Sequence, residues 1–277
     1  MRCVVLIAAS MALGFCAAEA QQSNQASPGW VADKSGCHVW KPHPLPNETI
    51  TWSGRCVNGR AEGKGTAQWF QDGKPISRSE GLFRAGRLNG QGTESFENGN
   101  RYEGDYRDGS AHGRGVFTWK NGDRYEGEWK DGKRSGRGVI AYADGGTYDG
   151  EWSDDTPNGR GVRVWGGSGQ ERGDRAEGEF RNGFISHGTI VFGRDGVRYE
   201  GDFAVGADGK HAMKNGFGNQ FWPDGRRYTG MWLESRANGP GTFRATDGRI
   251  YTGWWSDGCI HIGSGGAAVG KEVWECR

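Results

Sequence analysis

A repeat of 23 residues constrains this chain more than any other feature. Residues 102–124 read YEGDYRDGSAHGRGVFTWKNGDR, residues 125–147 read YEGEWKDGKRSGRGVIAYADGGT, and a third unit starts at Tyr148. In repeat architectures of this kind, each unit buries its apolar surface only against its neighbours. We therefore expect an extended stack of similar units and not a globular fold around one central core.

Further units follow the same pattern less regularly. One is lengthened by GGSGQERG around residues 166–173 and another by VGADGKHAMK around residues 205–214, while the unit from Ala176 has GFISHGT in place of GxxxGxG. The units begin at Thr51, Ser79, Tyr102, Tyr125, Tyr148, Ala176, Tyr199, Tyr228 and Tyr251. We predict about nine repeats over residues 51–262.

Each unit predicts two short β-strands. Tyr102, Gly104 and Tyr106 alternate with Glu103 and Asp105, and this period of two places aromatic side chains on one face and polar ones on the other. Asn-Gly and Asp-Gly dipeptides separate the strands and favour type I′ turns, in which both central residues have positive φ. These dipeptides are Asn98-Gly99, Asn121-Gly122, Asp144-Gly145, Asp195-Gly196, Asp224-Gly225 and Asp247-Gly248. The predicted fold is all-β: an elongated single-layer antiparallel sheet of stacked β-hairpins.

Composition excludes several other classes. Glycine supplies 52 of 277 residues, and each glycine in a helix interior costs about 1 kcal/mol, so a helical bundle is excluded. The chain has 35 basic and 34 acidic residues, a net charge of +1. This balance gives no electrostatic reason to expect nucleic acid or an anionic membrane as partner.

The N-terminus predicts export. Residues 1–20 place one Arg before an apolar run and end in Ala18-Glu19-Ala20, the pattern of a cleaved secretory signal peptide. A transmembrane anchor is disfavoured because the run is short, and lipidation at Cys16 is disfavoured by the bulky Phe15. We expect a periplasmic or secreted protein, cleaved near Ala20, with residues 21–36 as a flexible lead-in.

Cleavage would leave Cys37, Cys56, Cys259 and Cys276. Four thiols in an exported chain predict two disulfides, for which three pairings are possible. We favour Cys37–Cys56 and Cys259–Cys276, because each pair is local and lies at one end of the chain. They would tie an N-terminal cap, residues 37–50, and a C-terminal cap, residues 263–277. A zinc site is disfavoured because it needs cysteines two to four residues apart.

Ten aromatic residues form the candidate binding row. They are Tyr102, Tyr106, Phe117, Trp119, Tyr125, Trp129, Tyr142, Tyr148, Trp152 and Trp165. The row could stack sugar rings or grip a peptide. Packing of one repeat against the next is the favoured interpretation, because the fold requires it, and one row could do both.

A second column is acidic. It contains Glu103, Glu126, Asp149, Glu177 and Glu200, with Asp105, Glu128 and Glu151 beside it. Equivalent positions lie two strands apart, about 9.6 Å, too far to share one calcium ion. We expect a solvated face whose charge is offset by Arg114, Arg137 and Arg160, and no metal or cofactor.

Catalytic motifs are missing from the sequence. It contains no GxSxG, HExxH or GxxxxGK[ST], and no dinucleotide loop follows a GxG pair such as Gly113-Arg114-Gly115. The six histidines show no metal-ligand spacing. We expect no enzymatic activity.

The pattern YEGxWxxGxxxGxGxxxxxxGxx over residues 51–260 resembles the membrane occupation and recognition nexus (MORN) repeat. GCHVWKPHPLPNETITWSGRCVNGRAEGKG, near the N-terminus, resembles the opening of exported bacterial proteins of that family. The resemblance implies a β-hairpin solenoid that acts as a scaffold, dimeriser or binding surface. Family members have been linked to phospholipids, but an exported, charge-balanced chain would not meet inositol lipids.

Three functions follow in order of preference. The first is a non-enzymatic exported scaffold that binds an unidentified protein or a second copy of itself, with contacts from the aromatic row and the two lengthened loops. The alternative is a module that binds cell-wall glycan. Phospholipid binding comes last, so membrane contact is not expected. Nucleic-acid binding is not expected either, because the charge of the chain is balanced.

Overall fold

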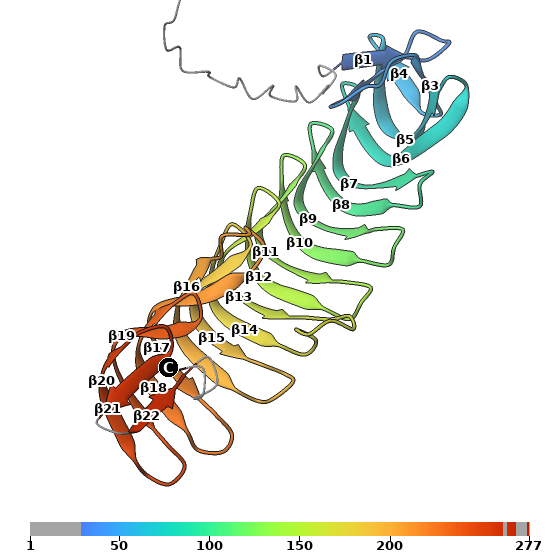
Figure 1. Cartoon of the computed structure of the whole chain (residues 1–277). Helices are drawn as coiled ribbons and strands as arrows, with labels where there is room; N and C mark the ends of the chain where they lie inside the picture. Colours follow the sequence, from blue (N-terminus) through green and yellow to red (C-terminus); the bar gives the residue numbers. More distant parts are fainter. Residues whose placement is uncertain (1–28, 263–264, 270–275, 277) are drawn as a thin grey trace, which may run out of the picture.

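The computed structural model describes residues 29–262, 265–269 and 276, which form strands, turns and no helix. The predicted fold is confirmed: Figure 1 shows a ladder of β-hairpins running from one end of the molecule to the other. No segment within these ranges is a helix that could span a bilayer. The predicted signal peptide and residues 21–28 lie outside the described residues.

The strands of the N-terminal half are β1 (Gly29–Ala32), β2 (His38–Lys41), β3 (Glu48–Trp52), β4 (Arg55–Val57), β5 (Arg60–Gln71), β6 (Lys74–Arg84), β7 (Arg87–Phe96), β8 (Arg101–Arg107), β9 (Ser110–Thr118), β10 (Arg124–Lys130) and β11 (Lys133–Ala141). Those of the C-terminal half are β12 (Thr147–Ser153), β13 (Thr156–Val164), β14 (Arg175–Arg181), β15 (Phe184–Val191), β16 (Arg198–Val205), β17 (Ala212–Phe221), β18 (Arg227–Leu233), β19 (Arg236–Arg244), β20 (Ile250–Trp255), β21 (Cys259–Ile262) and β22 (Gly265–Ala268).

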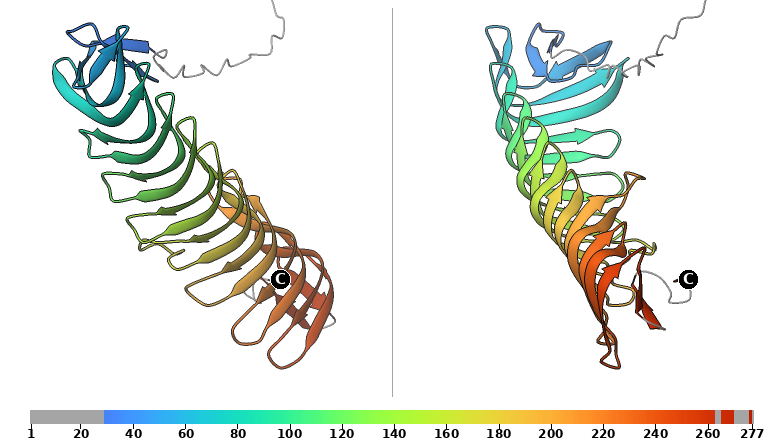
Figure 2. Two further views of the ribbon diagram at one scale, coloured as in Figure 1. Left: turned by 180° about the vertical axis from the view of Figure 1, so that it is seen from behind. Right: turned by 60° about the vertical axis from the view of Figure 1, so that its left-hand side comes forward.

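From β5 to β20, each strand pairs in antiparallel fashion with the strand that follows it in the sequence. The sheet therefore grows by one hairpin at a time, and no strand crosses over another in this stretch. The turned views of Figure 2 show that it stays one layer thick and twists along its length.

A row of glycines sets the register of the whole sheet. One glycine from each strand faces the glycine of the next strand, and the row comprises Gly65, Gly81, Gly92, Gly104, Gly115, Gly127, Gly138, Gly150, Gly161, Gly178, Gly188, Gly201, Gly218, Gly230, Gly241 and Gly253. We call this row the glycine spine. A slip by one residue would move every aromatic side chain to the opposite face.

The glycine spine exists because tyrosine rings lie directly on it. A Cβ atom on Gly115 would lie 2.2 Å from Tyr102 Oη, and one on Gly138 would lie 2.2 Å from Tyr125 Oη. Each hydroxyl donates a hydrogen bond to the carbonyl three residues further on, at 3.1 Å for Tyr102 and 3.0 Å for Tyr125. The ring thus packs on bare backbone, which only glycine provides.

The turns differ from the prediction. Positive φ at both central residues occurs at Asp108-Gly109 and Asp131-Gly132, which join the two strands of one unit. At the six predicted dipeptides only the glycine has positive φ, because these turns are longer. At Asn121-Gly122, for example, Trp119 N donates to Asp123 O at 2.9 Å. The type I′ assignment was therefore wrong at these six positions.

The Asn or Asp of these longer turns has another purpose. Asn121 Oδ1 accepts the backbone N–H of Asp123 at 3.1 Å, and Asp144 Oδ1 accepts that of Gly146 at 2.8 Å. A side chain that accepts the N–H two residues further on closes a turn locally. This contact favours Asn or Asp at the position before the glycine, and a type I′ turn favours the same residues.

Residues 29–36, predicted to be a flexible lead-in, form β1 and a turn into β2. Asp33 Oδ1 accepts N–H groups from Ser35 at 2.8 Å and Cys37 at 2.9 Å. The Trp30 ring anchors β1, because Arg60 lies 4.5 Å from the ring centroid and a Cβ on Gly86 would lie 2.6 Å from Trp30 Cζ3. The lead-in prediction is corrected for these residues.

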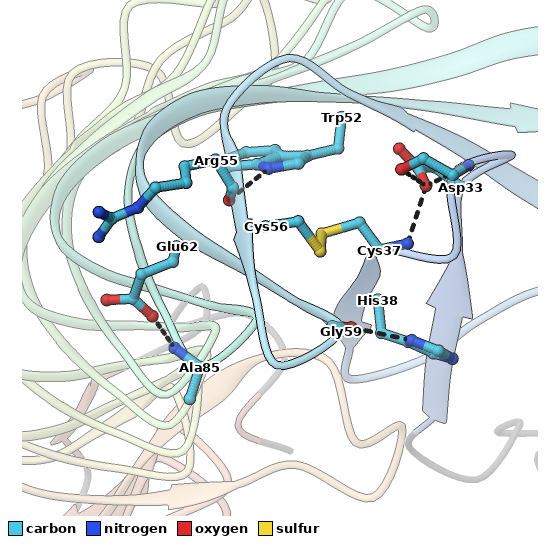
Figure 3. Close-up of a disulfide and its surroundings, with 10 residues drawn as sticks. Asp33, Cys37, His38, Trp52, Arg55, Cys56, Gly59, Glu62 and Ala85 are labelled. Carbon is cyan, nitrogen blue, oxygen red and sulfur yellow. Dashed lines mark hydrogen bonds between the residues drawn. A yellow bond between two sulfur atoms is a disulfide. The ribbon is translucent and has the colours of Figure 1, made fainter.

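Both ends of the sheet carry a disulfide. Cys37 is bonded to Cys56 with 5.8 Å between Cα atoms, and Cys259 to Cys276 with 5.5 Å. Figure 3 shows the first bridge, which joins Cys37, directly before β2, to Cys56 of β4; nearby, His38 Nδ1 lies 3.0 Å from Gly59 O. These are the two pairs that the sequence favoured. The bridge fixes the β1–β2 hairpin to the end of the sheet.

Candidate functional site

Six of the ten predicted aromatic residues are buried in the sheet's own packing. They are Tyr102, Tyr106, Tyr125, Trp129, Tyr148 and Trp152. Edge-to-face contacts join successive units: the ring centroids of Tyr102 and Trp129 are 5.2 Å apart, and those of Tyr125 and Trp152 are 5.3 Å apart. This geometry is favourable for aromatic pairs. These rings connect one hairpin to the next and have little surface for a ligand.

The indole N–H groups are also engaged. Trp129 Nε1 donates to Gly115 O at 3.2 Å and Trp152 Nε1 to Gly138 O at 3.0 Å. The same bond recurs from Trp232 to Gly218 and from Trp255 to Gly241. Each indole therefore spans from one unit to the glycine spine of the preceding one.

We expect Trp152→Phe to lower the free energy of unfolding by roughly 1–3 kcal/mol, because it leaves the buried Gly138 carbonyl without its donor. Urea denaturation followed by circular dichroism would measure the change. Trp119→Phe is the control, and it should cost less because Trp119 is half-buried. Equal losses from the two variants would show that the interstrand hydrogen bond contributes little.

The other four predicted residues, Phe117, Trp119, Tyr142 and Trp165, are half-buried. Trp119, Tyr142 and Trp165 each precede one of the longer turns, on the same face of the sheet as the buried rings. Together with Phe96, Phe192 and Trp222 they form a line that we call the aromatic edge row. Phe117, Trp119, Tyr142 and Trp165 are thus the part of the predicted binding row that remains accessible, whereas Phe96, Phe192 and Trp222 were not predicted.

Arg134 and Lys214 each lie over a buried tryptophan ring. Arg134 lies 4.4 Å from the Trp152 centroid, and Lys214 Nζ lies 4.9 Å from that of Trp232. Burial lowers the pKa of Lys214 to about 8, and Asp195 opposes this shift. Sequence analysis missed both residues, which stabilise rings through cation–π contacts.

The opposite face is charged, and its carboxylates accept hydrogen bonds from backbone N–H groups or pair with arginines. Asp105 Oδ2 accepts the N–H of Arg114 at 3.0 Å, while Glu128 and Glu151 accept those of Arg137 and Arg160 at 3.2 and 3.1 Å. Glu103, Glu126, Glu177 and Glu200 pair with Arg101, Arg124, Arg175 and Arg198 at 2.6–2.7 Å. Among the described residues, no group of three His, Cys, Asp or Glu has metal-binding geometry.

The charged face becomes apolar in the last repeats. Where earlier units place Arg114 opposite Glu128, β17 to β20 place Phe217 opposite Met231 and Pro240 opposite Trp254. We call these four residues the C-terminal apolar strip. Trp254 is 74% exposed and Phe217 is 53% exposed. Sequence analysis missed the strip, although comparing equivalent positions of the repeats would have found it.

A cavity opens where Ala176 replaces the tyrosine of other units. It has a volume of about 140 Å³ and is lined by Arg163, Trp165 and Phe180, among others. Glu171 from the first lengthened loop and His211 from the second both border it. The two loops that the sequence singled out therefore meet at one place on the aromatic face.

A larger pocket of about 290 Å³ lies where the N-terminal cap meets the first repeats. Its walls include Trp40, Lys41, Trp69, Glu94 and Tyr106. We call it the N-terminal pocket. Burial raises the pKa of Glu94 above its ordinary 4.5, and the ammonium of Lys41 opposes the shift. This carboxyl is thus held where its charged form is disfavoured.

We expect Glu94 to make stability depend on pH. A carboxyl whose pKa is raised by folding stabilises the folded state below pH 4.5, and that contribution is lost as pH rises through the folded-state value. Lys41, Glu48, His43 and Tyr106 face the same pocket, so the measurement compares the chain with Glu94→Gln at each pH. The variant should be more stable by roughly 1–3 kcal/mol at pH 7.5 and closer to equal at pH 4.5. A constant difference across this range would contradict the assignment to Glu94.

The geometry defines a class of protein: a repeat protein of stacked β-hairpins with a glycine spine, one aromatic face and one charged face. The chain belongs to the MORN-repeat family. The family model, described as the MORN repeat, matches residues 53–73, 80–101, 102–124, 125–147, 148–170 and 228–248. Strands β14 to β17 lie between the last two matches and continue the same register.

Comparison with curated proteins found no significant match. Among solved structures, the chain is similar to the TCP domain of SAS-4 (dCPAP) of Drosophila melanogaster in complex with a proline-rich motif of Ana2 (dSTIL), at 15% identity and a TM-score of 0.34, covering 59% of this chain and 83% of that one. It is also similar to the TCP10 domain of Danio rerio CPAP in complex with a STIL peptide, at 14% identity and a TM-score of 0.26, covering 75% and 100%.

Proposed function

We propose that this chain is a non-enzymatic exported scaffold that binds a protein partner through its C-terminal apolar strip. The exposure of Phe217 and Trp254, at positions where earlier repeats carry charged side chains, carries the proposal. Contiguous exposed apolar side chains that are surrounded by polar ones mark interaction surfaces. Trp is also among the residues that contribute most to binding energy at such surfaces.

A protein partner suits this strip better than a glycan. The four side chains carry no charged group, whereas sugar recognition needs several polar groups around the stacking ring. The aromatic edge row supplies a second apolar surface on the other face of the sheet. A scaffold with one contact surface on each face can hold two partners at once.

Export is supported by the two disulfides, because such bonds persist in oxidising compartments. A periplasmic or secreted location remains our proposal. So does self-association, in which the strips of two copies would pack together.

The test compares the chain with the double variant Phe217→Ser/Trp254→Ser. Affinity capture from the cell envelope and light scattering after size exclusion would measure partner binding and self-association. We expect the double variant to lose a protein partner or to become monomeric, while Val139→Ser, an exposed control on the same face of β11, behaves like the parent chain. Retention of every partner and of the oligomeric state by the double variant would refute the proposal.

A further inference from the structure

The N-terminal pocket interrupts the repeat pattern with polar groups. Ser79 occupies the position of Tyr102 in its unit, and Glu94 occupies the position of Phe117. In the sheet Glu94 lies opposite both Ser79 and Tyr102. A carboxyl and a hydroxyl therefore replace two rings at adjoining positions of the aromatic face. Polar groups buried in this way destabilise a fold unless something satisfies them.

The Glu94 carboxyl has no ionic partner. The hydroxyls of Ser77 and Ser79 lie beside it and favour its charged form, and Ser79 lines the pocket together with Glu94. Among the residues that the structure describes, no cation lies within ion-pair distance of Glu94. The carboxyl is therefore left for a ligand that brings a positive charge.

The pocket already accommodates one ammonium group. Lys41 Nζ pairs with Glu48, whose side chain is almost wholly buried, and lies 4.8 Å from the Trp69 centroid. Because Lys41 pairs with Glu48, the cluster of Lys41, Glu48 and Glu94 has two carboxyls for one ammonium. With both carboxyls ionised, the charge of this cluster is −1, which favours a further cation.

The walls suit a ligand with an apolar stem. Trp40 from β2, Phe96 at the end of β7 and Tyr106 from β8 line the pocket around Glu94. Aromatic faces stabilise ammonium and guanidinium groups and also cover alkyl chains. The volume of about 290 Å³ accommodates one such group with its stem.

We propose that the N-terminal pocket binds an alkylammonium or guanidinium group, with Glu94 as its counter-ion. A basic side chain of a partner protein and a free amine both carry this group. The site is separate from the C-terminal apolar strip, so the result of its test does not depend on whether the proposed function is correct.

Titration calorimetry with the disulfide-bonded chain tests the proposal. The probes are n-butylammonium chloride, Nα-acetyl-lysine methylamide and Nα-acetyl-arginine methylamide, with n-butanol as the uncharged comparator. We expect at least one cationic probe to bind at least tenfold more tightly than n-butanol. Tighter binding of an amino-acid amide than of butylammonium identifies a partner's side chain as the source, and the reverse identifies a free amine.

Two variants locate the binding. Glu94→Gln should weaken binding of the cation at least tenfold. Glu126→Gln, an exposed carboxylate on the opposite face, should leave it unchanged. Because Glu94→Gln is expected to stabilise the fold, its loss of binding would not reflect unfolding. Failure of every cationic probe to bind more tightly than n-butanol, or full binding by Glu94→Gln, would overturn the proposal.

Discussion

Replacing Gly138 with alanine should lower the free energy of unfolding by roughly 3 kcal/mol or more, even though alanine is normally preferred to glycine within a strand. The new Cβ would lie 2.2 Å from Tyr125 Oη and 2.5 Å from Tyr125 Cζ. The ring cannot move aside, because Tyr125 is fully buried between Trp129 and Trp152. Urea denaturation followed by circular dichroism and by tryptophan fluorescence would measure the loss.

Two comparisons make this result specific. Gly169→Ala, in the first lengthened loop, has nothing within 4 Å of the new Cβ and should change stability little. In a Tyr125→Leu background the clashing ring atoms are gone, so Gly138→Ala should cost less than about 1 kcal/mol there. The same cost in both backgrounds would show that the backbone, and not the ring, excludes the side chain.

Removing the N-terminal disulfide has the second largest expected effect. Cys37 and Cys56 are 19 residues apart, and closing a loop of this size stabilises a fold by roughly 3 kcal/mol in the chain-entropy description. Cys37 is also fully buried, so Cys37→Ala/Cys56→Ala loosens the packing around it. We expect a lower unfolding midpoint and new sites of limited proteolysis between β1 and β4.

Cys259→Ala/Cys276→Ala is the matched control, because its bridge closes a loop of similar length, 17 residues apart. Its new cleavage sites should lie at the C-terminal end, and the N-terminal cap should stay protected. Each repeat contacts only its neighbours, so damage at one end should not spread to the other. Simultaneous exposure of both ends by either variant would contradict this picture.

The fold was predictable because its pattern repeats in phase. Alternation in YEGDY indicates which face each side chain occupies, and the 23-residue spacing indicates that all hairpins share one register. The turns were less predictable, because Asn121-Gly122 fits two turn geometries and only loop length separates them. The order of residues 29–36 depends on tertiary contacts of Trp30, which no local pattern reveals.

The candidate sites were harder to predict than the fold. Aromatic residues at repeat spacing were correctly placed on one face, yet burial separates Tyr125, which holds hairpins together, from Trp119, which stays accessible. The N-terminal pocket and the C-terminal apolar strip arise where single residues depart from the repeat. What these residues can bind depends on side chains up to two strands away. Only the strand register of the sheet identifies those neighbouring residues.

The common glycine register makes the molecule adjustable in length. Because β8 to β13 are joined by equivalent glycine pairs, a hairpin inserted among them would meet the same neighbours as those already present. Each insertion would add two strands, about 9.6 Å. The N-terminal pocket and the C-terminal apolar strip lie towards opposite ends of this array, so each inserted hairpin would increase the distance between them by one fixed step.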